Sequence, residues 1–413
     1  MTTKPVPCFT EVSAIPASWL DESFRQANER TKERPDLIML NVGEPAFSPP
    51  DSVADELAAA ALDGQTRYVD VQGLLKLREQ LVAKLDAVNN IDAHPDRIFV
   101  TPGSCQGLAA LMRSLAKPGA EILMPEIHWP VHLQQALLAE LRPVFYRVDE
   151  CFAPDPDSIQ EMASPHTRIL LLNTPSNPAG AVADQALLRR LYHLAASAGW
   201  QVISDEAYED FTFESPHFSI GAIERGRPVK HRIVNSVFTF SKGHAMTGYR
   251  LGYVSVSRPA VGAAMRVVQE SNIIAPSAPI QYAGLAALEA REILTTNRCY
   301  VLGNRDLALP PLVKEGLLRT LPGGGWYVMV DISSTGMIGE EFADELLARY
   351  DVAVVPGSGF SAQPAFNSDG TLLPLGRGRA TEGLVRIAFC VDRERLVDGV
   401  QRIVEFVHEK RDS

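Results

Sequence analysis

Residues 168–208 hold the clearest alternation of strand and helix patterns in the chain, and they read RILLLNTPSNPAGAVADQALLRRLYHLAASAGWQVISDEAY. The stretch opens with an apolar run at 168–172 and closes with another at 201–204, and both runs have the length of a buried strand. Between them, residues 184–198 show the apolar spacing of an amphipathic helix. Two apolar strands joined through a helix predict parallel neighbours in a sheet that helices cover on both faces.

The same alternation continues on both sides of this stretch. Further apolar runs of strand length lie at 97–100, 121–124, 232–238 and 252–256. Two more helical patterns lie at 108–116 and 131–140. The central part of the chain therefore predicts an α/β fold with a mostly parallel sheet.

The pattern changes from about residue 289. A helix is predicted over 289–309, stopped by Pro310 and Pro311, and a last helix over 393–410. Three strands are predicted at 326–331, 352–355 and 384–389, with a long Gly- and Pro-rich loop at 361–383. We predict three parts: an N-terminal arm at 1–40 that packs with the small domain, a large domain at 41–290 and a smaller α+β domain at 291–413.

The overall composition excludes several classes of protein. The chain has 413 residues, enough for two domains, and a net charge of −11 without a run of Lys or Arg, which argues against nucleic acid and anionic membranes as partners. No segment approaches the ~18 apolar residues of a membrane span, and the start lacks a signal-like apolar stretch. Five scattered cysteines without a CxxC pair predict no metal site and no disulfide framework, so we expect a cytoplasmic protein.

Polar or Gly/Pro-rich sequences follow five of the predicted strands. They are TPGSCQ at 101–106, PEIHWP at 125–130, NTPSNP at 173–178, DEAY at 205–208 and TFSK at 239–242. In open α/β sheets, ligands bind at the carboxyl ends of the strands. We therefore expect these five segments to meet and form a binding site.

Lys242 is the first candidate for chemistry. Alone, a lysine in a strand-to-helix turn is most often a solvated surface group. Here it follows an apolar strand and the hydroxyl residues Thr239 and Ser241, and Arg250 lies eight positions later. Burial and a neighbouring cation lower the pKa of an amine and let it form a Schiff base. Arg250 could also grip a phosphate with two parallel hydrogen bonds.

Asp205, Tyr208 and Asn177 are candidates for contacts to a cofactor ring. Asp205 could be a helix N-cap, and Asn177 a turn residue. Alternatively, Asp205 could be a buried carboxylate that keeps a pyridine nitrogen protonated, as pyridoxal phosphate requires. Tyr208 and Asn177 could then hydrogen-bond the ring oxygen of that cofactor.

Further candidates come from three other segments. Ser104 and Cys105 open a predicted helix whose free N–H groups could bind phosphate, although many helices start this way. Trp129 is either a core aromatic or a group that stacks on a flat ring. Arg386 lies in a predicted strand, where it is either on an exposed face or clamps a substrate carboxylate.

Taken together, these residues resemble the class I/II aminotransferases, the fold-type-I pyridoxal-phosphate enzymes. The segments that carry the resemblance are NVGEP at 41–45, residues 68–73, TPGS at 101–104, NTPSNPAG at 173–180, SDEAY at 204–208, SK and RLGY within 241–253, GGGWY at 323–327, PGSGF at 356–360 and VRI at 385–387. They occur in family order over nearly the whole chain. The resemblance implies a seven-stranded, mostly parallel sheet in the large domain.

The resemblance also implies a role for each residue. Lys242 would be the Schiff-base lysine and the acid/base, Asp205 would pair with the ring nitrogen, and Asn177 and Tyr208 would contact the ring hydroxyl. Trp129 would stack on the ring. The phosphate ligands would be Ser104, Cys105, Thr239 and Arg250. Tyr68 would reach the phosphate of the other subunit of a homodimer with shared active sites. The substrate carboxylate would bind Arg386, Gly43 and Asn177.

Two positions depart from the family pattern. Trp129 stands where many relatives carry Tyr, and stacking should survive that change. Cys105 stands where many relatives carry Gln, Gly or Lys. Because acid-specific relatives of one branch use the Lys, its absence disfavours Asp or Glu as the substrate.

Three functions remain open on the sequence. The first is an aminotransferase that moves an amino group from an L-amino acid to a 2-oxo acid. The second is a lyase, cyclase or oxidase on the same cofactor, because fold does not decide the reaction. The third is a catalytically silent sensor of this fold, which ranks last because no DNA-binding extension precedes Asn41 and the reactive set is intact.

Overall fold

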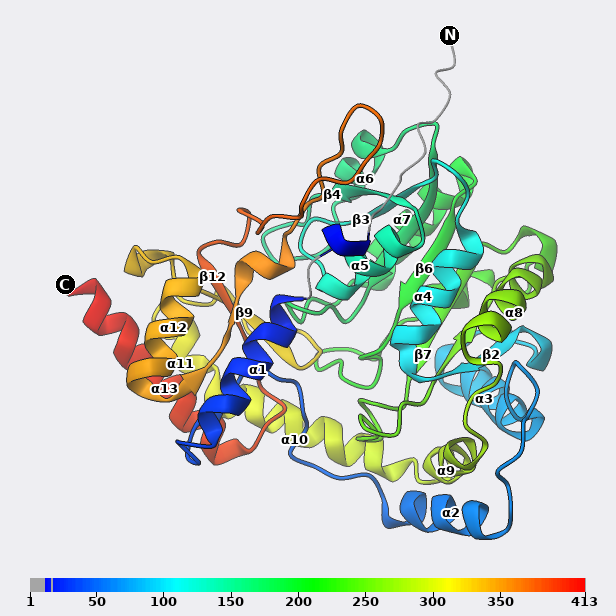
Figure 1. Cartoon of the computed structure of the whole chain (residues 1–413), viewed down its shortest axis with the longest axis horizontal. Coiled ribbons are helices and arrows are strands. Elements are labelled where there is room, and N and C mark those ends of the chain that lie inside the picture. Colours follow the sequence, from blue (N-terminus) through cyan, green and yellow to red (C-terminus); the bar gives the residue numbers. More distant parts are fainter. Residues whose placement is uncertain (1–11, 16–17, 413) are drawn as a thin grey trace.

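The computed structural model describes residues 12–15 and 18–412, and it contains one large sheet and a smaller α+β body beside it (Figure 1). The large sheet has seven strands in the order β2-β8-β7-β6-β5-β3-β4. The strands are β2 (Ile98–Thr101), β3 (Glu121–Pro125), β4 (Arg142–Tyr146), β5 (Thr167–Asn173), β6 (Gln201–Asp205), β7 (Val234–Thr239) and β8 (Gly252–Ser255). All neighbours are parallel except β8, which runs antiparallel to both β2 and β7. The predicted fold class is therefore confirmed.

Helices cover both faces of this sheet, as its apolar strands require. In β5, Ile169 and Leu171 belong to one buried cluster, while Leu170 and Leu172 belong to another on the opposite face. The first face packs against α4 (Gly103–Leu115), α5 (Pro130–Leu138) and α8 (Pro259–Ile273). The second packs against α6 (Pro156–Met162) and α7 (Gln185–Ala198). On this second face, β2, β7 and β8 are covered by α2 (Asp51–Leu62), α3 (Leu75–Asn89) and α9 (Ala278–Glu289).

Helix α7 shows how local sequence sets these boundaries. The Asp184 carboxylate accepts a hydrogen bond from the backbone N–H of Leu187 (2.7 Å) and so caps the first turn. The helix ends at Gly199, which adopts a left-handed conformation with φ 75°. The next strand, β6, begins two residues later and lies parallel to β5.

The smaller body has two sheets and its own core. An antiparallel sheet of order β11-β12-β9 combines β9 (Tyr327–Asp331), β11 (Val355–Pro356) and β12 (Leu384–Ala388). Around it pack α10 (Glu292–Ala308), α11 (Pro310–Lys314), α12 (Gly339–Tyr350) and α13 (Arg393–Arg411). No helix among the described residues is long and apolar enough to cross a membrane.

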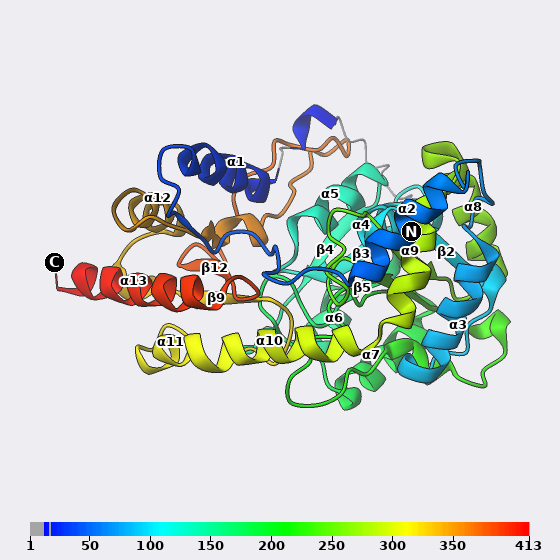
Figure 2. The same ribbon diagram turned by 90° about the horizontal axis from the view of Figure 1, so that it is seen from below.

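The N-terminal segment joins this smaller body. Strand β1 (Ile38–Met39) pairs in parallel with β10 (Val352–Ala353). Helix α1 (Trp19–Thr31) lies beside α12 in Figure 2, and Ala27 packs against Ala353. Residues 1–11 and 16–17 of the predicted arm lie outside the described residues, and the three domain boundaries stay predictions.

Some predicted elements differ from the structure. The helix predicted at 289–309 is the end of α9 followed by α10, which ends at Ala308, just before Pro310 and Pro311, as predicted. Pro310 then begins the short helix α11, because proline fits the first turn of a helix. The strand predicted at 352–355 is split between β10 and β11 in different sheets. The predicted loop at 361–383 contains no helix or strand and packs Phe366 and Leu372 on the large body.

Candidate active site

The carboxyl ends of the parallel strands meet in one cleft, as the sequence predicts. The cleft is lined by Gly43, Glu44, Ser104, Cys105, Trp129, Asn173, Asn177, Asp205, Ala207, Tyr208, Thr239, Ser241, Lys242, Thr247, Arg250 and Tyr327. Ten of the twelve predicted site residues are in this set. Of the other two, Arg386 touches the cleft through Asn177, and Tyr68 does not reach it.

Lys242 lies just after β7 among aromatic rings. Its Nζ is 4.7 Å from the centre of the Trp326 ring and 5.6 Å from that of Tyr208. The negative faces of aromatic rings attract an ammonium group and hold a flexible lysine in place. The amine is therefore held in the cleft opposite the end of β6.

Asp205 is the last residue of β6 and is buried. Its Oδ2 is 2.8 Å from Nε2 of His132, and its Oδ1 accepts a hydrogen bond from the N–H of Ala207 (3.2 Å). His132 itself is buried in α5, and its ring packs edge-on against Trp129. This arrangement fixes the carboxylate toward the cleft, as a group that pairs with a ring nitrogen must be fixed.

His132 is a site residue that the sequence analysis missed. It follows Trp129 by three positions at the start of a helix, and residues three apart share a helix face. That spacing is the signal that could have found it. In a sequence, however, a lone histidine in an apolar helix looks like a core residue.

An anion-binding corner lies around Arg250. The Arg250 Nη1 donates to the carbonyl of Thr247 (2.7 Å) and lies 3.5 Å from Oγ of Ser241, which is 3.0 Å from Oγ1 of Thr239. Helix α4 begins beside it, and a Cβ on Gly103 would lie only 2.6 Å from Nη2 of Arg250. The first turn of α4 thus presents free N–H groups next to a guanidinium and two hydroxyls.

Cys105 is in this first turn of α4. Its carbonyl accepts a hydrogen bond from Nε2 of Gln135 (2.8 Å), and its thiol lies 3.4 Å from the same atom. Burial raises the pKa of the Cys105 thiol, although Arg250 acts in the opposite direction. The thiol is therefore neutral at ordinary pH and adds no charge to the corner.

A second corner forms around Arg386, which is buried in β12. Nη1 donates to Oδ1 of Asn177 (3.0 Å) and Nη2 donates to the carbonyl of Asn41 (2.9 Å). The guanidinium lies 4.0 Å from the centre of the Tyr327 ring. Burial lowers the pKa of Arg386, and its Nε has no hydrogen-bond partner among the described residues. A buried cation with a free donor is suited to bind a carboxylate.

Tyr208 and Tyr327 complete this side of the cleft. Their rings meet edge-on with centres 6.1 Å apart. Burial, together with Tyr327, raises the pKa of Tyr208 well above its ordinary value, so its phenol stays protonated and can donate a hydrogen bond. Tyr327 was not among the predicted residues, and it also explains Gly43: a Cβ there would collide with the Tyr327 hydroxyl.

Tyr68 lies outside the cleft of its own chain. Its side chain is 85% exposed, on the segment between α2 and α3. The structure of a single chain therefore does not bring Tyr68 to the other predicted site residues.

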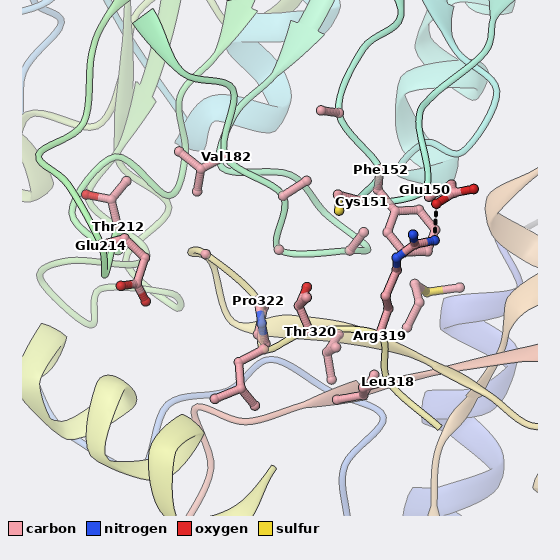
Figure 3. A pocket seen from close by; sticks show the side chains of 18 of the residues that line it. Glu150, Cys151, Phe152, Val182, Thr212, Glu214, Leu318, Arg319, Thr320 and Pro322 are labelled. Atoms are coloured by element: carbon pink, nitrogen blue, oxygen red, sulfur yellow. Dashed lines mark ion pairs between the residues drawn. The ribbon is translucent and has the colours of Figure 1, made fainter. Parts of the chain in front are cut away.

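A second cavity lies between the two bodies (Figure 3). It is bordered by residues 150–153, 179–184 and 212–215 of the large body and by residues 318–323 of the smaller one, and an ion pair between Glu150 and Arg319 crosses it. Among the residues that the structure describes, none of the twelve predicted residues lines this cavity, and no lysine or histidine does so either. The candidate active site is therefore the first cleft.

Comparisons with known proteins agree on one family. A family model described as aminotransferase class I and II matches residues 35–403. An aspartate aminotransferase from Pyrococcus horikoshii is 30% identical over 395 residues, which cover 92% of this chain and 93% of the relative. An aspartate/prephenate aminotransferase from Thermus thermophilus is 32% identical over 346 residues, covering 82% and 87%. A solved structure of aspartate aminotransferase from Thermus thermophilus with maleate matches with a TM-score of 0.86 at 30% identity, covering 95% of this chain and 98% of that one.

Proposed function

This chain belongs to the class I and II aminotransferases, which depend on pyridoxal 5′-phosphate. From that premise we propose that Lys242 carries the cofactor. The enzyme then moves an amino group from an L-amino acid to a 2-oxo acid. The observation that supports this most strongly is the placement of Lys242 between an anion-binding corner and a buried carboxylate. None of the comparisons favours a lyase, a cyclase, an oxidase or a silent sensor.

The residues of the cleft match three features of this cofactor: its phosphate, its ring nitrogen, and the face and oxygen of its ring. Arg250, the two hydroxyls at Thr239 and Ser241, and the start of α4 with Ser104 and Cys105 match a phosphate dianion. At the other end, the fixed carboxylate of Asp205 matches a protonated ring nitrogen.

Three more residues complete the cofactor contacts. Trp129 borders the cleft and offers a flat surface on which a ring can stack. The Tyr208 phenol and the Asn177 amide also line the cleft, which supports the proposal that they hydrogen-bond a ring oxygen.

When bound, the cofactor supplies an electron sink for the pair left on the α-carbon of the amino acid. Lys242 Nζ would accept the proton that leaves that carbon and would donate it again in the second proton transfer of the reaction. The aromatic rings of Trp326 and Tyr208 keep this amine near its partner atoms. Asp205, whose carboxylate is held by His132, would keep a proton on the ring nitrogen of the bound cofactor.

Arg386 binds the α-carboxylate that every amino acid and 2-oxo acid substrate carries. Asn177 and Asn41 accept one hydrogen bond from each of its two Nη atoms, which leaves the second N–H of each Nη and the N–H of Nε without a partner among the described residues. Gly43 leaves room for the Tyr327 hydroxyl and lets the substrate approach the backbone there.

The amino donor has an uncharged side chain in this proposal. Among the described residues that line the cleft, the cations are Lys242 and Arg250, and both are already assigned. Several relatives are named for aspartate, whose second carboxylate would need a further cation. Cys105, which stays neutral, supplies none.

The working enzyme is a homodimer in this proposal, with Tyr68 serving the phosphate site of the other subunit. The support is the exposure of large side chains close to Tyr68 in the sequence, since Leu62 and Leu75 are 88% and 53% exposed. A subunit interface that covers this stretch of chain would remove these apolar side chains from water. A cytoplasmic location is proposed because the four described cysteines, Cys105, Cys151, Cys299 and Cys390, are unpaired thiols.

Borohydride reduction of the purified enzyme, followed by peptide mapping, tests the assignment of Lys242. We expect the reduced cofactor to be fixed on the peptide that contains Lys242. A Lys242→Ala protein should be colourless and inactive. A fixed cofactor on another lysine, or a yellow and active Lys242→Ala protein, would overturn the assignment.

A further inference from the structure

The turn after β6 presents different residues to its two sides. Asp205 and Tyr208 line the cleft. Glu206 and Glu209 instead make their contacts with a polar network on the other side of the turn, where the partners are Lys84 and Asn89 of α3, together with His217 and Ser219. We call these six residues the back network: Lys84, Asn89, Glu206, Glu209, His217 and Ser219. The mechanism described above uses none of them.

The network begins at Lys84. Its Nζ lies 2.5 Å from Oε1 of Glu209 and donates to Oδ1 of Asn89 (2.9 Å). The same ammonium lies 4.7 Å from the centre of the Phe238 ring of β7. Lys84 and Glu209 have side chains only 11% and 9% exposed. A charge pair so enclosed loses most of its hydration and depends on its partners.

From there the hydrogen bonds continue without a break to Glu206. Asn89 donates to Oε2 of Glu209 (2.6 Å) and to Oγ of Ser219 (2.8 Å). Ser219 donates to Oε2 of Glu206 (2.5 Å), and His217 Nε2 is 2.8 Å from the same oxygen. Helix α3 is thereby tied to both ends of the 205–210 turn.

Asp210 extends this region to the turn that carries Lys242. Its carboxylate packs so closely on Gly243 that a Cβ there would overlap it. On the other side, Asn297 of α10 donates to the carbonyl of Gly243 (2.9 Å). Asp210 thus contacts the chain one residue after Lys242.

The charges in this region are unequal. Three carboxylates, Glu206, Glu209 and Asp210, face two cationic groups, Lys84 and His217. Although burial opposes it, the carboxylates of Glu209 and Asp210 raise the pKa of Lys84 above its ordinary value. The other titratable groups that face the region are His244 and Tyr253, which interact with Lys84, and Arg298 of α10.

We propose that Lys84 is a positioning residue for the active site. By pairing with Glu209 it fixes the 205–210 turn, and so aims Asp205 and Tyr208 into the cleft. It also balances the negative charge that Asp210 brings beside the Lys242 turn. The proposal rests on the proposed function for the roles of Asp205, Tyr208 and Lys242, and it predicts effects on bound cofactor as well as on turnover.

The test compares Lys84→Met with Lys76→Met. Lys76 lies on the same helix and is exposed, so its variant is the matched control. For each protein four quantities are measured: the melting temperature without cofactor, the dissociation constant of pyridoxal phosphate, kcat, and the pH midpoint of the bound-cofactor absorbance.

We expect Lys84→Met to lower kcat at least tenfold and to weaken cofactor binding. The absorbance midpoint should move to higher pH, because carboxylates that have lost their neighbouring cation favour the protonated form of the group at Lys242. Lys84→Arg should recover part of each loss, and Lys76→Met should match the wild type. A Lys84→Met protein that only melts earlier, with kcat, affinity and midpoint unchanged, would overturn the proposal.

A second variant keeps the proposal testable if Lys84→Met does not fold. Asp210→Asn keeps the shape and removes the negative charge that Asp210 carries beside Gly243 above about pH 7, so the absorbance midpoint should move to lower pH. An unchanged midpoint would count against the proposal. Wild-type enzyme that binds the cofactor but does not transaminate would contradict the proposed function alone, because the affinity and the midpoint would still report on Lys84.

Discussion

Arg386 is the residue for which the structure makes the clearest kinetic prediction. Its guanidinium is 3% exposed and two of its nitrogens are held by Asn177 and Asn41. Arg386→Ala removes a charge-assisted contact worth about 1.5–3 kcal/mol, so KM for the donor and for the oxo acid should rise about 10- to 150-fold.

The affinity for the cofactor is the internal control, because Arg386 does not line the cofactor end of the cleft. It should change by less than about threefold, measured by fluorescence titration with pyridoxal phosphate. An Arg386→Ala enzyme with a wild-type KM for both substrates would show that another group binds the carboxylate.

Asp210 gives a prediction about stability and pH. The ordinary pKa of its carboxyl group is 3.8, and burial together with Glu209 raises the pKa of this group in the folded protein to about 7. Between these values the folded state binds more protons than the unfolded chain, so the free energy of unfolding falls as pH rises through this window. Asp210→Asn should therefore lose less stability than the wild type between about pH 4 and about pH 7, measured by urea unfolding. Parallel curves for the two proteins would contradict this.

The sequence predicts many of the site residues because each follows an apolar strand. Asp205 and Lys242 stand directly after strand patterns, where a polar residue is informative. His132 and Tyr327 were missed because they lie inside regular elements among apolar neighbours, where histidine and tyrosine look like core residues. The pairing of His132 with Asp205 is a contact between residues 73 positions apart, and no local pattern encodes it.

At the scale of elements, the absence of a side chain at Gly252 lets β8 pack closely against the start of α4. A Cβ at this position would lie 2.6 Å from the backbone N of Ser104 and 2.8 Å from the carbonyl of Phe238. Since backbone atoms cannot move aside easily, Gly252→Ala should lower the free energy of unfolding by about 1–3 kcal/mol and weaken cofactor binding through the start of α4. Gly316→Ala is not a fair control because of its positive φ, whereas Gly376, which has open space around it, is suitable. Equal stability of the Gly252→Ala and Gly376→Ala proteins would contradict the close packing.

The type of each long element could be predicted, but not every pairing or boundary. Strand 252–256 reads as apolar in the same way as its neighbours, yet β8 alone is antiparallel in the large sheet. The connection at 240–251 forms turns and contains no helix, whereas parallel strands are usually joined through a helix, so β8 returns antiparallel to β7. Likewise, apolar residues at 352–355 do not reveal that the chain changes sheets between Ala353 and Val355.

At the scale of the whole molecule, the exposed Tyr68 predicts active sites shared between two subunits. Light scattering should give about 90 kDa, twice the 45.1 kDa of one chain. Lys242→Ala and Tyr68→Ala homodimers should both have little transaminase activity. Mixed dimers should each hold one intact site, so an equal mixture after subunit exchange should recover about a quarter of wild-type activity. No recovery in a mixture that demonstrably exchanges subunits would place Tyr68 outside the partner's site.

The changed pattern after residue 289 predicts a division into two domains, but it does not predict how the N-terminal segment joins the smaller body. The pairing of β1 with β10 joins residues more than 300 positions apart through two short strands. Such short strands carry too few residues for a pattern, so only the folded chain reveals them.

The central claim is that this enzyme transfers an amino group, and a single half-reaction tests it most directly. The purified enzyme is mixed with each of a panel of L-amino acids, without an oxo acid, while the cofactor spectrum and the products are followed. We predict conversion of the cofactor to its amine form with one equivalent of the matching 2-oxo acid released per site, for a donor with an uncharged side chain, and reversal when an oxo acid is added. Continued turnover that yields ammonia, peroxide or a cyclised product, without build-up of the amine form, would contradict the account.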